Sequence, residues 1–259
     1  MWRSLSYLLR GLLIAYLAYL GALYFMQRDF IYYPMPDEAD TTAQAYALQA
    51  APGITLRGWE VNPGRDHALL YFGGNAERVS HSIGVAEKHF AEHSVYLVHY
   101  RGYGDSDGEP GEAALLGDAL ALYDDLARRH ERISVIGRSL GSAMAVHVAA
   151  RRPVASSVLI TPFDSIQHIA AEHYPLVPVS WLLKDKFESW KSAAAIDSKV
   201  LVLIAENDFV VPRQHTDNLL RHFKPGVARA IELPGTDHIS ISHHPDYYPQ
   251  IAAFVGRDQ

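Results

Sequence analysis

The chain has 259 residues, of which 49% are hydrophobic, and its formal net charge at pH 7 is −6. This length suits one α/β domain of ordinary size or two small ones, and the hydrophobic content is ample for a buried core. The acidic balance, with a pI near 6.1, gives no reason to expect a nucleic-acid partner, which usually requires a concentrated basic face. The chain has no cysteine, which excludes a cysteine nucleophile, a thiolate zinc site and a disulfide framework.

The N-terminal segment predicts a membrane anchor. After Arg3 and Arg10, residues 11–27 carry no charge, and a helix of that length rises about 25 Å, close to the thickness of a bilayer core. Aromatic residues at both ends of this run suit the two interfaces of a membrane. Residues 1–29 are therefore predicted to form a single-pass transmembrane signal anchor.

Two alternatives remain for this segment. A cleaved signal peptide is disfavoured because Leu20 precedes Gly21 and Ala22 at the position where a cleavage site needs a small residue. The other alternative is a helix that lies in the membrane plane or is buried in the protein. The positive-inside tendency places the N-terminus in the cytoplasm and residues 30–259 on the other side of the membrane, which in a bacterium is the periplasm.

Residues 30–259 predict one α/β domain with a doubly wound, mostly parallel sheet. Short apolar runs, typical of strands covered on both faces, alternate with helical stretches. The expected strands are 54–61, 68–72, 95–100, 133–136, 157–161, 200–205 and 228–233. The expected helices are 78–92, 112–129, 140–151, 213–223 and 247–255. The longest interruption, residues 162–199, is rich in Pro and Trp and predicts a short cap, not a separate lid domain.

The most informative motif is Gly137-Arg138-Ser139-Leu140-Gly141, which lies between an apolar run and an Ala/Val-rich helix. A Gly-x-Ser-x-Gly sequence in this position predicts the nucleophile elbow of a serine hydrolase. The turn is so sharp that the serine adopts a strained backbone conformation and only small residues fit beside it. Ser139 is therefore the predicted nucleophile.

A serine nucleophile needs an imidazole base, which in turn needs a carboxylate to orient it. In the chain order Ser, acid, His, the acid should follow a late strand, and Asp208 follows the predicted strand 200–205. Glu206, nearer the strand end, and Asp164, after the preceding strand, are the competing candidates. Asp208 could also be a loop residue that only caps the turn at Pro212.

The base should follow the last strand, and His238 lies just beyond residues 228–233. The chain has fourteen histidines, so chain order weighs more than residue type. His222 lies on a predicted helix and is expected at the surface. His243 and His244, near Asp246, raise the question of a metal site, but adjacent histidines point in different directions and no second carboxylate is spaced to join them.

The oxyanion needs two backbone N–H groups. Leu140, directly after the nucleophile, supplies one. The second is assigned to Asn75 in the sequence Gly73-Gly74-Asn75-Ala76, with Gly74 as the alternative. A plain β-to-α turn is the structural alternative for this loop.

Several segments together resemble the α/β-hydrolase superfamily, most closely its small, N-terminally membrane-anchored serine hydrolases, whose relatives include acyl-protein thioesterases that remove palmitate. The matching segments run in the expected order over nearly the whole chain. They are 30–34 (FIYYP), 71–76 (YFGGNA), 100–108 (YRGYGDSDG), 137–141 (GRSLG), 161–165 (TPFDS), 208–212 (DFVVP) and 234–238 (PGTDH). The resemblance implies that residues 100–108 form a turn that borders the site from below.

Two residues depart from the family pattern. Gly73 stands where relatives often have His in a His-Gly pair, which leaves the geometry of the oxyanion loop open, and His99 stands where many have an acid. No catalytic role is assigned to His99.

The sequence thus predicts a membrane-anchored serine hydrolase of carboxylic esters or thioesters, with an acyl or lipid-like substrate and no cofactor or metal. Serine at the elbow argues against dehalogenase and epoxide hydrolase chemistry, which use an aspartate there. A catalytically silent scaffold of the same fold and a serine peptidase are the alternatives. Chain-length preference, natural substrate and oligomeric state are not encoded in any pattern that periodicity resolves.

Overall fold

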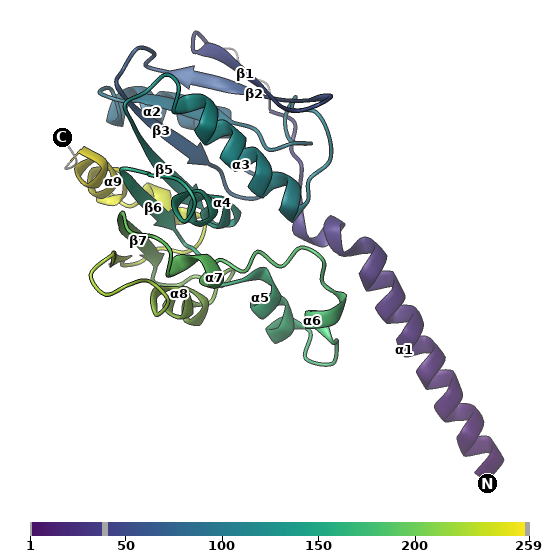
Figure 1. The fold of residues 1–259 in the computed structure, drawn as a ribbon. Coiled ribbons are helices and arrows are strands. Elements are labelled where there is room, and N and C mark those ends of the chain that lie inside the picture. Colours follow the sequence, from purple (N-terminus) through teal and green to yellow (C-terminus); the bar gives the residue numbers. More distant parts are fainter. Residues whose placement is uncertain (1, 38–40, 257–259) are drawn as a thin grey trace.

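The computed structural model describes residues 2–37 and 41–256, and Figure 1 shows a central sheet with helices on both faces. The sheet has eight strands in the order β1-β2-β4-β3-β5-β6-β7-β8. The strands are β1 (Gln44–Ala51), β2 (Ile54–Val61), β3 (His67–Phe72), β4 (Ser94–Val98), β5 (Arg132–Arg138), β6 (Ser156–Ile160), β7 (Lys199–Ala205) and β8 (Ala228–Leu233). The first two pairings, β1–β2 and β2–β4, are antiparallel, and the others are parallel.

Helices cover the sheet on both faces, which is why the central strands read as continuous apolar runs. Every residue of β4 and β6 is buried, as expected for parallel strands between two helical layers. One apolar core lies beneath α3 (Glu112–Leu126), α4 (Leu140–Ala149), α7 (Trp190–Ala193) and α8 (Arg213–Leu220). The other lies beneath α2 (Ile83–His89) and α9 (Tyr247–Val255). The predicted fold class, a doubly wound and mostly parallel α/β sheet, is confirmed.

The structure differs from the sequence prediction at two elements. The edge strand β1 was not predicted, because its sequence QAYALQAA is dominated by residues with helical preference and becomes a strand only by pairing with β2. The predicted helix 78–92 is a short 3₁₀ turn, η1 (Val79–Ser82), followed by α2. A second 3₁₀ turn, η2 (Ser240–His243), precedes α9.

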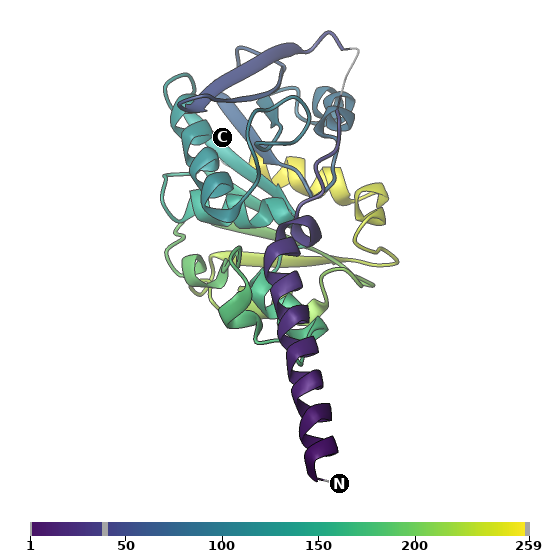
Figure 2. The same cartoon turned by 90° about the vertical axis from the view of Figure 1, so that its right-hand side faces the viewer.

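A single long helix, α1 (Trp2–Ile31), projects from the domain (Figures 1 and 2). It ends two residues later than the predicted anchor. With a mean hydropathy of 1.7 over its most apolar window, it is long and apolar enough to cross a membrane. The side chains of that window are not buried against the domain.

The cap segment between β6 and β7 contains α5 (Ile166–His173), α6 (Val179–Leu182) and α7. Figure 1 shows α5 and α6 on the side of the domain from which α1 projects. This arrangement brings the cap, the first helix and the carboxyl ends of the parallel strands to one end of the molecule.

Candidate active site

The elbow between β5 and α4 has the backbone that the sequence predicts. Ser139 has φ 50° and ψ −117°, a conformation that costs a non-glycine residue of order 1–3 kcal/mol. A Cβ at position 137 would lie 2.4 Å from the Gly141 carbonyl oxygen, and one at position 141 would lie 2.0 Å from the Phe72 carbonyl oxygen. Both flanking glycines are therefore sterically required, and the Ser139 N–H is held by the carbonyl of Ile160 at 2.9 Å.

Three predicted residues meet in one hydrogen-bonded chain. His238 Nε2 lies 2.9 Å from Ser139 Oγ, and His238 Nδ1 lies 2.7 Å from Asp208 Oδ2. The side chains of His238 and Asp208 are 12% and 5% exposed, so solvent screens their interaction only weakly. The structure thus brings the predicted nucleophile, base and acid together from the ends of β5, β8 and β7.

Backbone groups fix the carboxylate of Asp208. Its Oδ1 accepts the N–H groups of Val210 at 2.9 Å and Val211 at 2.7 Å, which leaves Oδ2 for His238. The two loops are tied by the Asn207 N–H, which donates to the Thr236 carbonyl at 2.8 Å. This fixed carboxylate can hold the imidazole in the tautomer that presents Nε2 to the serine.

The competing acids lie elsewhere. Glu206 is exposed and accepts the N–H of Gly235 at 2.6 Å. Asp164 is buried and accepts from His215 Nδ1 at 2.9 Å and from His168 Nδ1 at 2.6 Å. These contacts join the cap to α8, and neither carboxylate is a hydrogen-bond partner of His238.

The other histidines considered from the sequence also lie apart from this chain of contacts. His222 is exposed and bonds to the Asn218 carbonyl, as expected of a surface residue. His243 ends η2, and His244 Nδ1 lies 4.0 Å from Asp246.

The loop after β3 lies against the elbow. A Cβ at Gly74 would lie 3.8 Å from the Ser139 Cβ. The Gly74 N–H donates to Glu77 Oε2 at 2.7 Å, so it is occupied within the protein. The backbone N–H groups of Asn75 and Leu140 donate no hydrogen bond within the described part of the chain, so both stay the candidate oxyanion donors.

Glu77 and Arg138 form a network around this loop that the sequence prediction missed. Glu77 Oε1 accepts the hydroxyl of Tyr71 at 2.6 Å, while Oε2 lies 3.7 Å from the Arg138 guanidinium. Arg138 in turn donates to the carbonyls of His238 and Ile239 at 3.4 and 3.3 Å. One ion pair therefore connects the oxyanion loop to the loop of the base. Arg138 lay in the elbow motif, but no pattern pointed to Glu77.

The Tyr100–Gly108 turn supports the same loop from beneath. The Tyr100 hydroxyl donates to the Gly73 carbonyl at 2.7 Å, and the Tyr103 hydroxyl donates to Asn75 Oδ1 at 2.8 Å. Burial raises the pKa of Tyr103 to about 12 and that of Tyr100 further, so both phenols keep the proton that they donate. This support gives the YRGYG sequence a physical role at the site.

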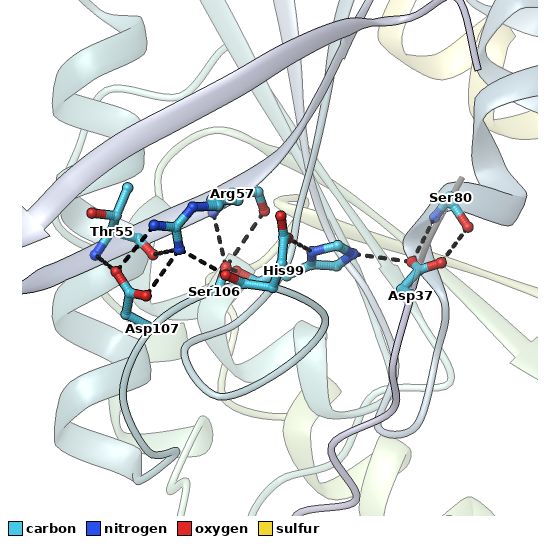
Figure 3. Close-up of polar contacts among 8 residues, drawn as sticks. Asp37, Thr55, Arg57, Ser80, His99, Ser106 and Asp107 are labelled. Carbon is cyan, nitrogen blue, oxygen red and sulfur yellow. Dashed lines mark hydrogen bonds and ion pairs between the residues drawn. The ribbon is translucent and has the colours of Figure 1, made fainter. Parts of the chain in front are cut away.

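His99, the residue that departs from the family pattern, fastens this turn to the segment after α1 (Figure 3). Its Nε2 lies 3.0 Å from Asp37 Oδ2, and its Nδ1 lies 3.2 Å from Asp105 Oδ1. Asp37 also accepts the N–H of Ser80 at 3.0 Å and its hydroxyl. Here the carboxylate lies between hydroxyl and imidazole, the reverse of a catalytic triad, so His99 cannot take the proton of Ser80.

Sequence relatives define the class of the protein. An uncharacterized protein of Mycobacterium tuberculosis is 32% identical over 226 residues, which cover 82% of this chain and 80% of the relative. The alpha/beta hydrolase domain-containing protein WAV2 of Arabidopsis thaliana is 26% identical over 247 residues, covering 82% and 79%. No family model matches the chain.

A solved structure agrees in fold. The esterase Pf2001 of Pyrococcus furiosus superposes with a TM-score of 0.72 at 16% identity, over 86% of this chain and 98% of the esterase. With the sheet order and the elbow, these comparisons establish that the chain belongs to the α/β-hydrolase superfamily.

Proposed function

We propose that the protein is a membrane-anchored serine hydrolase that cleaves carboxylic ester or thioester bonds through Ser139, His238 and Asp208. The observation that carries the proposal is the continuous chain of two hydrogen bonds, 2.9 and 2.7 Å long, from Ser139 Oγ through His238 to Asp208. The esterase named among the structural neighbours supports ester chemistry by analogy of fold alone.

The reaction begins when Ser139 Oγ attacks the carbonyl carbon of the substrate and His238 Nε2 takes the hydroxyl proton. The negative charge moves to the carbonyl oxygen, where the N–H groups of Asn75 and Leu140 stabilise it. Collapse of this intermediate re-forms the carbonyl and breaks the bond to the alcohol or thiol, which leaves with the proton from His238. The acyl group remains on Ser139 as an ester.

Deacylation repeats these steps with water. His238 takes a proton from the water as its oxygen attacks the acyl-enzyme, and then returns that proton to Ser139 Oγ when the acid is released. Asp208 remains ionised throughout and stabilises the imidazolium that forms twice in the cycle. No cofactor takes part in this sequence.

A fluorophosphonate probe, which phosphorylates activated serines, tests the proposal. The full-length protein in detergent is expected to be labelled, and Ser139→Ala should lose both labelling and hydrolysis of p-nitrophenyl esters, by at least about 10⁴-fold. Ser192→Ala, a serine on α7 that is hydrogen-bonded to Arg151, is the matched control and should keep both. Folded wild-type protein that does not react would support a silent scaffold.

Turnover of different acyl donors tests the bond type. Acyl-CoA thioesters and p-nitrophenyl esters are the expected substrates, and aminoacyl anilides test the peptidase alternative. Rates confined to the anilide would contradict the ester proposal.

The anchor and its orientation are part of the proposal. The length and hydropathy of α1 support a single membrane span, and Arg3 and Arg10 support a cytoplasmic N-terminus with the domain outside. A reporter that works only outside the cytoplasm, fused after Gln259, is expected to be active. If it is inactive and a reporter that works only in the cytoplasm is active at the same position, the topology is the reverse of the one proposed.

A further inference from the structure

A cavity of about 720 Å³ lies on the face of the sheet that α2 and α9 cover. Its floor includes Leu97 of β4, Ile136 of β5 and Ile160 of β6, whose side chains are 3% exposed or less. Ala86 of α2 and Ile251 of α9 belong to its walls. Its volume and its mostly apolar lining are those of a small-molecule site.

Two polar side chains of this cavity have hydrogen-bonding capacity that the protein does not use. The side chain of Tyr247 is buried, at 4% exposure, and its hydroxyl has no hydrogen-bond partner among the described residues. Burial raises the pKa of Tyr247 well above its ordinary value, and the nearby charge of Arg138 offsets only part of this rise. The phenol therefore keeps its proton beside a cation and can donate it to an acceptor.

The guanidinium of Arg138 also lines the cavity. Its Nη2 donates to two carbonyls at 3.3 and 3.4 Å, whereas its Nε and Nη1 donate no hydrogen bond within residues 2–37 and 41–256. Its ion pair with Glu77 has a separation of 3.7 Å, which is longer than a hydrogen bond. A guanidinium with free N–H groups in a concave site is suited to a planar carboxylate, which it can bind through two parallel hydrogen bonds.

The charges around the cavity also favour an anion. Arg78, His81 and His243 line the cavity and are exposed to solvent. Glu77 is the one acidic side chain among the described lining residues, and its two oxygens already accept hydrogen bonds from β3 and from the oxyanion loop. Arg78 and Arg138 therefore leave the lining with a net positive charge.

We propose that this cavity binds a small organic acid with an apolar ring system. The carboxylate accepts hydrogen bonds from Arg138 and Tyr247, and the ring system lies on the apolar floor formed by β4, β5 and β6. None of Ser139, Asp208 and His238 is among the described residues that line the cavity. The site is therefore separate from the candidate active site, and its ligand is not the substrate.

The position of the cavity connects such a ligand to the oxyanion loop. Arg138 directly precedes Ser139 and donates to two carbonyls of the loop that carries the base. Ala76 lines the cavity, directly follows Asn75 and has φ 59°, a strained conformation for a residue with a Cβ. A carboxylate on Arg138 competes with Glu77 for the guanidinium and so weakens the ion pair that connects the two loops. Bound ligand is therefore expected to lower kcat, and this second part of the proposal rests on the proposed function.

Isothermal titration calorimetry of the full-length protein in detergent tests the site. The probe is 2-naphthoate, its neutral counterpart is 2-naphthamide, and titrations into protein-free micelles are subtracted. Naphthoate is expected to bind about 10-fold or more tightly than the amide, because hydrogen bonds to a charged group are the stronger ones. Equal affinities, or no binding of naphthoate, would overturn the proposal.

Two pairs of variants locate the bound probe. Tyr247→Phe removes only a hydroxyl and should weaken naphthoate binding by about 10-fold, whereas Tyr123→Phe, which changes a buried phenol in the other core, should not. Val85→Trp on α2 fills the cavity and should abolish binding, whereas Glu87→Trp, an exposed position of α2 outside the lining, should preserve it. Naphthoate binding that is equal in the wild type and Tyr247→Phe would place the probe elsewhere and overturn the proposal.

Hydrolysis of p-nitrophenyl butyrate tests the connection to the oxyanion loop. Saturating naphthoate should lower kcat of the wild type by about fivefold or more, a typical strength of coupling between two sites, with KM nearly unchanged. Tyr247→Phe should need about 10-fold more naphthoate for the same effect. A rise in KM with kcat unchanged would place naphthoate in the active site and overturn the proposal.

The two measurements separate this proposal from the proposed function. Naphthoate binding that depends on Tyr247, in a protein that turns over no ester, would refute the hydrolase and support the site. Ester turnover without naphthoate binding would overturn the site and leave the hydrolase standing. Binding that leaves kcat unchanged would support the site and refute its connection to the oxyanion loop.

Discussion

The two sides of the candidate site are built in different ways. The Ser139–His238–Asp208 side consists of short loops at the ends of buried parallel strands, and each side chain is fixed by backbone hydrogen bonds or by its partners. The cap side consists of short helices and loops that expose three large apolar side chains, those of Tyr174, Leu176 and Trp181. It is held by polar contacts, here called clasps, such as those of Gln27 with Lys184 and of Asp164 with His215. In the function that we propose, bond cleavage and the choice of substrate depend on separate parts of the molecule.

This division implies that substitutions on the two sides should change different quantities. Changes among the strand-end loops should lower kcat without altering acyl-chain preference. Changes in the cap clasps should alter the stability of the protein or its substrate preference, and they should leave the hydrolysis of short-chain esters nearly unchanged. The following variants test this separation, from the largest expected effect to the smallest.

Asp208→Asn should have the largest effect on the chemical step. The amide is nearly isosteric but no longer holds His238 in the tautomer that accepts the serine proton, so kcat should fall by about 10⁴-fold. The neighbouring Glu206→Gln is the matched control, because its carboxylate is exposed and, among the described residues, bonds only to Gly235. Steady-state kinetics with a short-chain ester provide the measurement, and equal losses in both variants would contradict the assignment of the acid.

Asp164→Asn should cause the largest loss of stability on the cap side. Asp164 and His215 are 2% and 4% exposed, and breaking a buried ion pair costs about 3–5 kcal/mol. Glu172→Gln removes the other carboxylate on His215, but this carboxylate is 48% exposed and should cost less than about 1 kcal/mol. Chemical denaturation measures both, and a small effect of Asp164→Asn would show that the clasp contributes little.

The Asp164–His215 ion pair predicts a pH range in which its contribution to stability is largest. Burial favours the neutral forms, but the mutual hydrogen bonds outweigh it, so the pKa of Asp164 is lowered and that of His215 is raised. The Asp164 contribution is present above the unfolded-state pKa of about 3.9 and is lost as pH falls through the lower folded-state value. The His215 contribution is present below about pH 6.5 and is lost as pH rises through the higher folded-state value.

The difference in unfolding free energy between wild type and Asp164→Asn should therefore be largest between about pH 4 and 6.5. It should shrink in more alkaline and in more acidic solution. A difference that stays constant from pH 5 to pH 9 would show that the clasp does not depend on a charged His215.

Glu77→Ala should have a smaller effect on the chemical step, because Glu77 acts through the oxyanion loop and not on the substrate. Its loss frees the Gly74 N–H and removes the ion-pair partner of Arg138. We expect kcat to fall by about 10- to 100-fold, somewhat less than for the removal of an oxyanion donor, with KM nearly unchanged. Glu77→Gln keeps an acceptor for Gly74 and should recover most of the rate. A change confined to KM would contradict a positioning role.

Gln27→Ala should have the smallest effect, on the attachment of α1 to the cap. It leaves the Lys184 N–H and the Leu182 carbonyl without their partner, a loss of about 1–2 kcal/mol. Met26→Ala is the control on the same helix, because Met26 is 48% exposed. Thermal unfolding in micelles should separate the two variants, and identical unfolding temperatures would show that α1 is held by other contacts.

The sequence predicted those parts of the fold and site that depend on local pattern and chain order. Ser139 lies in a motif whose steric requirement is local, and Asp208 and His238 follow the last two strands in chain order, β7 and β8. The contacts of Glu77 with Tyr71 and Arg138 depend on how a loop folds across an elbow, and no spacing rule specifies this. The pairing of Asp164 with His215 joins residues 51 positions apart, which a single sequence cannot reveal.

The cap was predicted only as a segment because its short helices gain their stability from tertiary contacts. The contact of the Tyr16 hydroxyl with the Leu176 carbonyl was equally hidden, because an apolar run gives no signal of what it touches. Strand β1 forms a strand because it pairs with β2. In each case the structure depends on the residues that a segment contacts, and the sequence of the segment alone does not specify them.

Helix α1 leads into the domain without a loose hinge, since Gln27 and Tyr32 on either side of its end are buried. If α1 spans a membrane as we propose, this junction fixes the depth and the orientation of the domain relative to the bilayer. The domain then cannot rotate freely about its anchor, and the candidate active site stays at one distance from the membrane. Cleavage of the chain at this junction would remove that constraint.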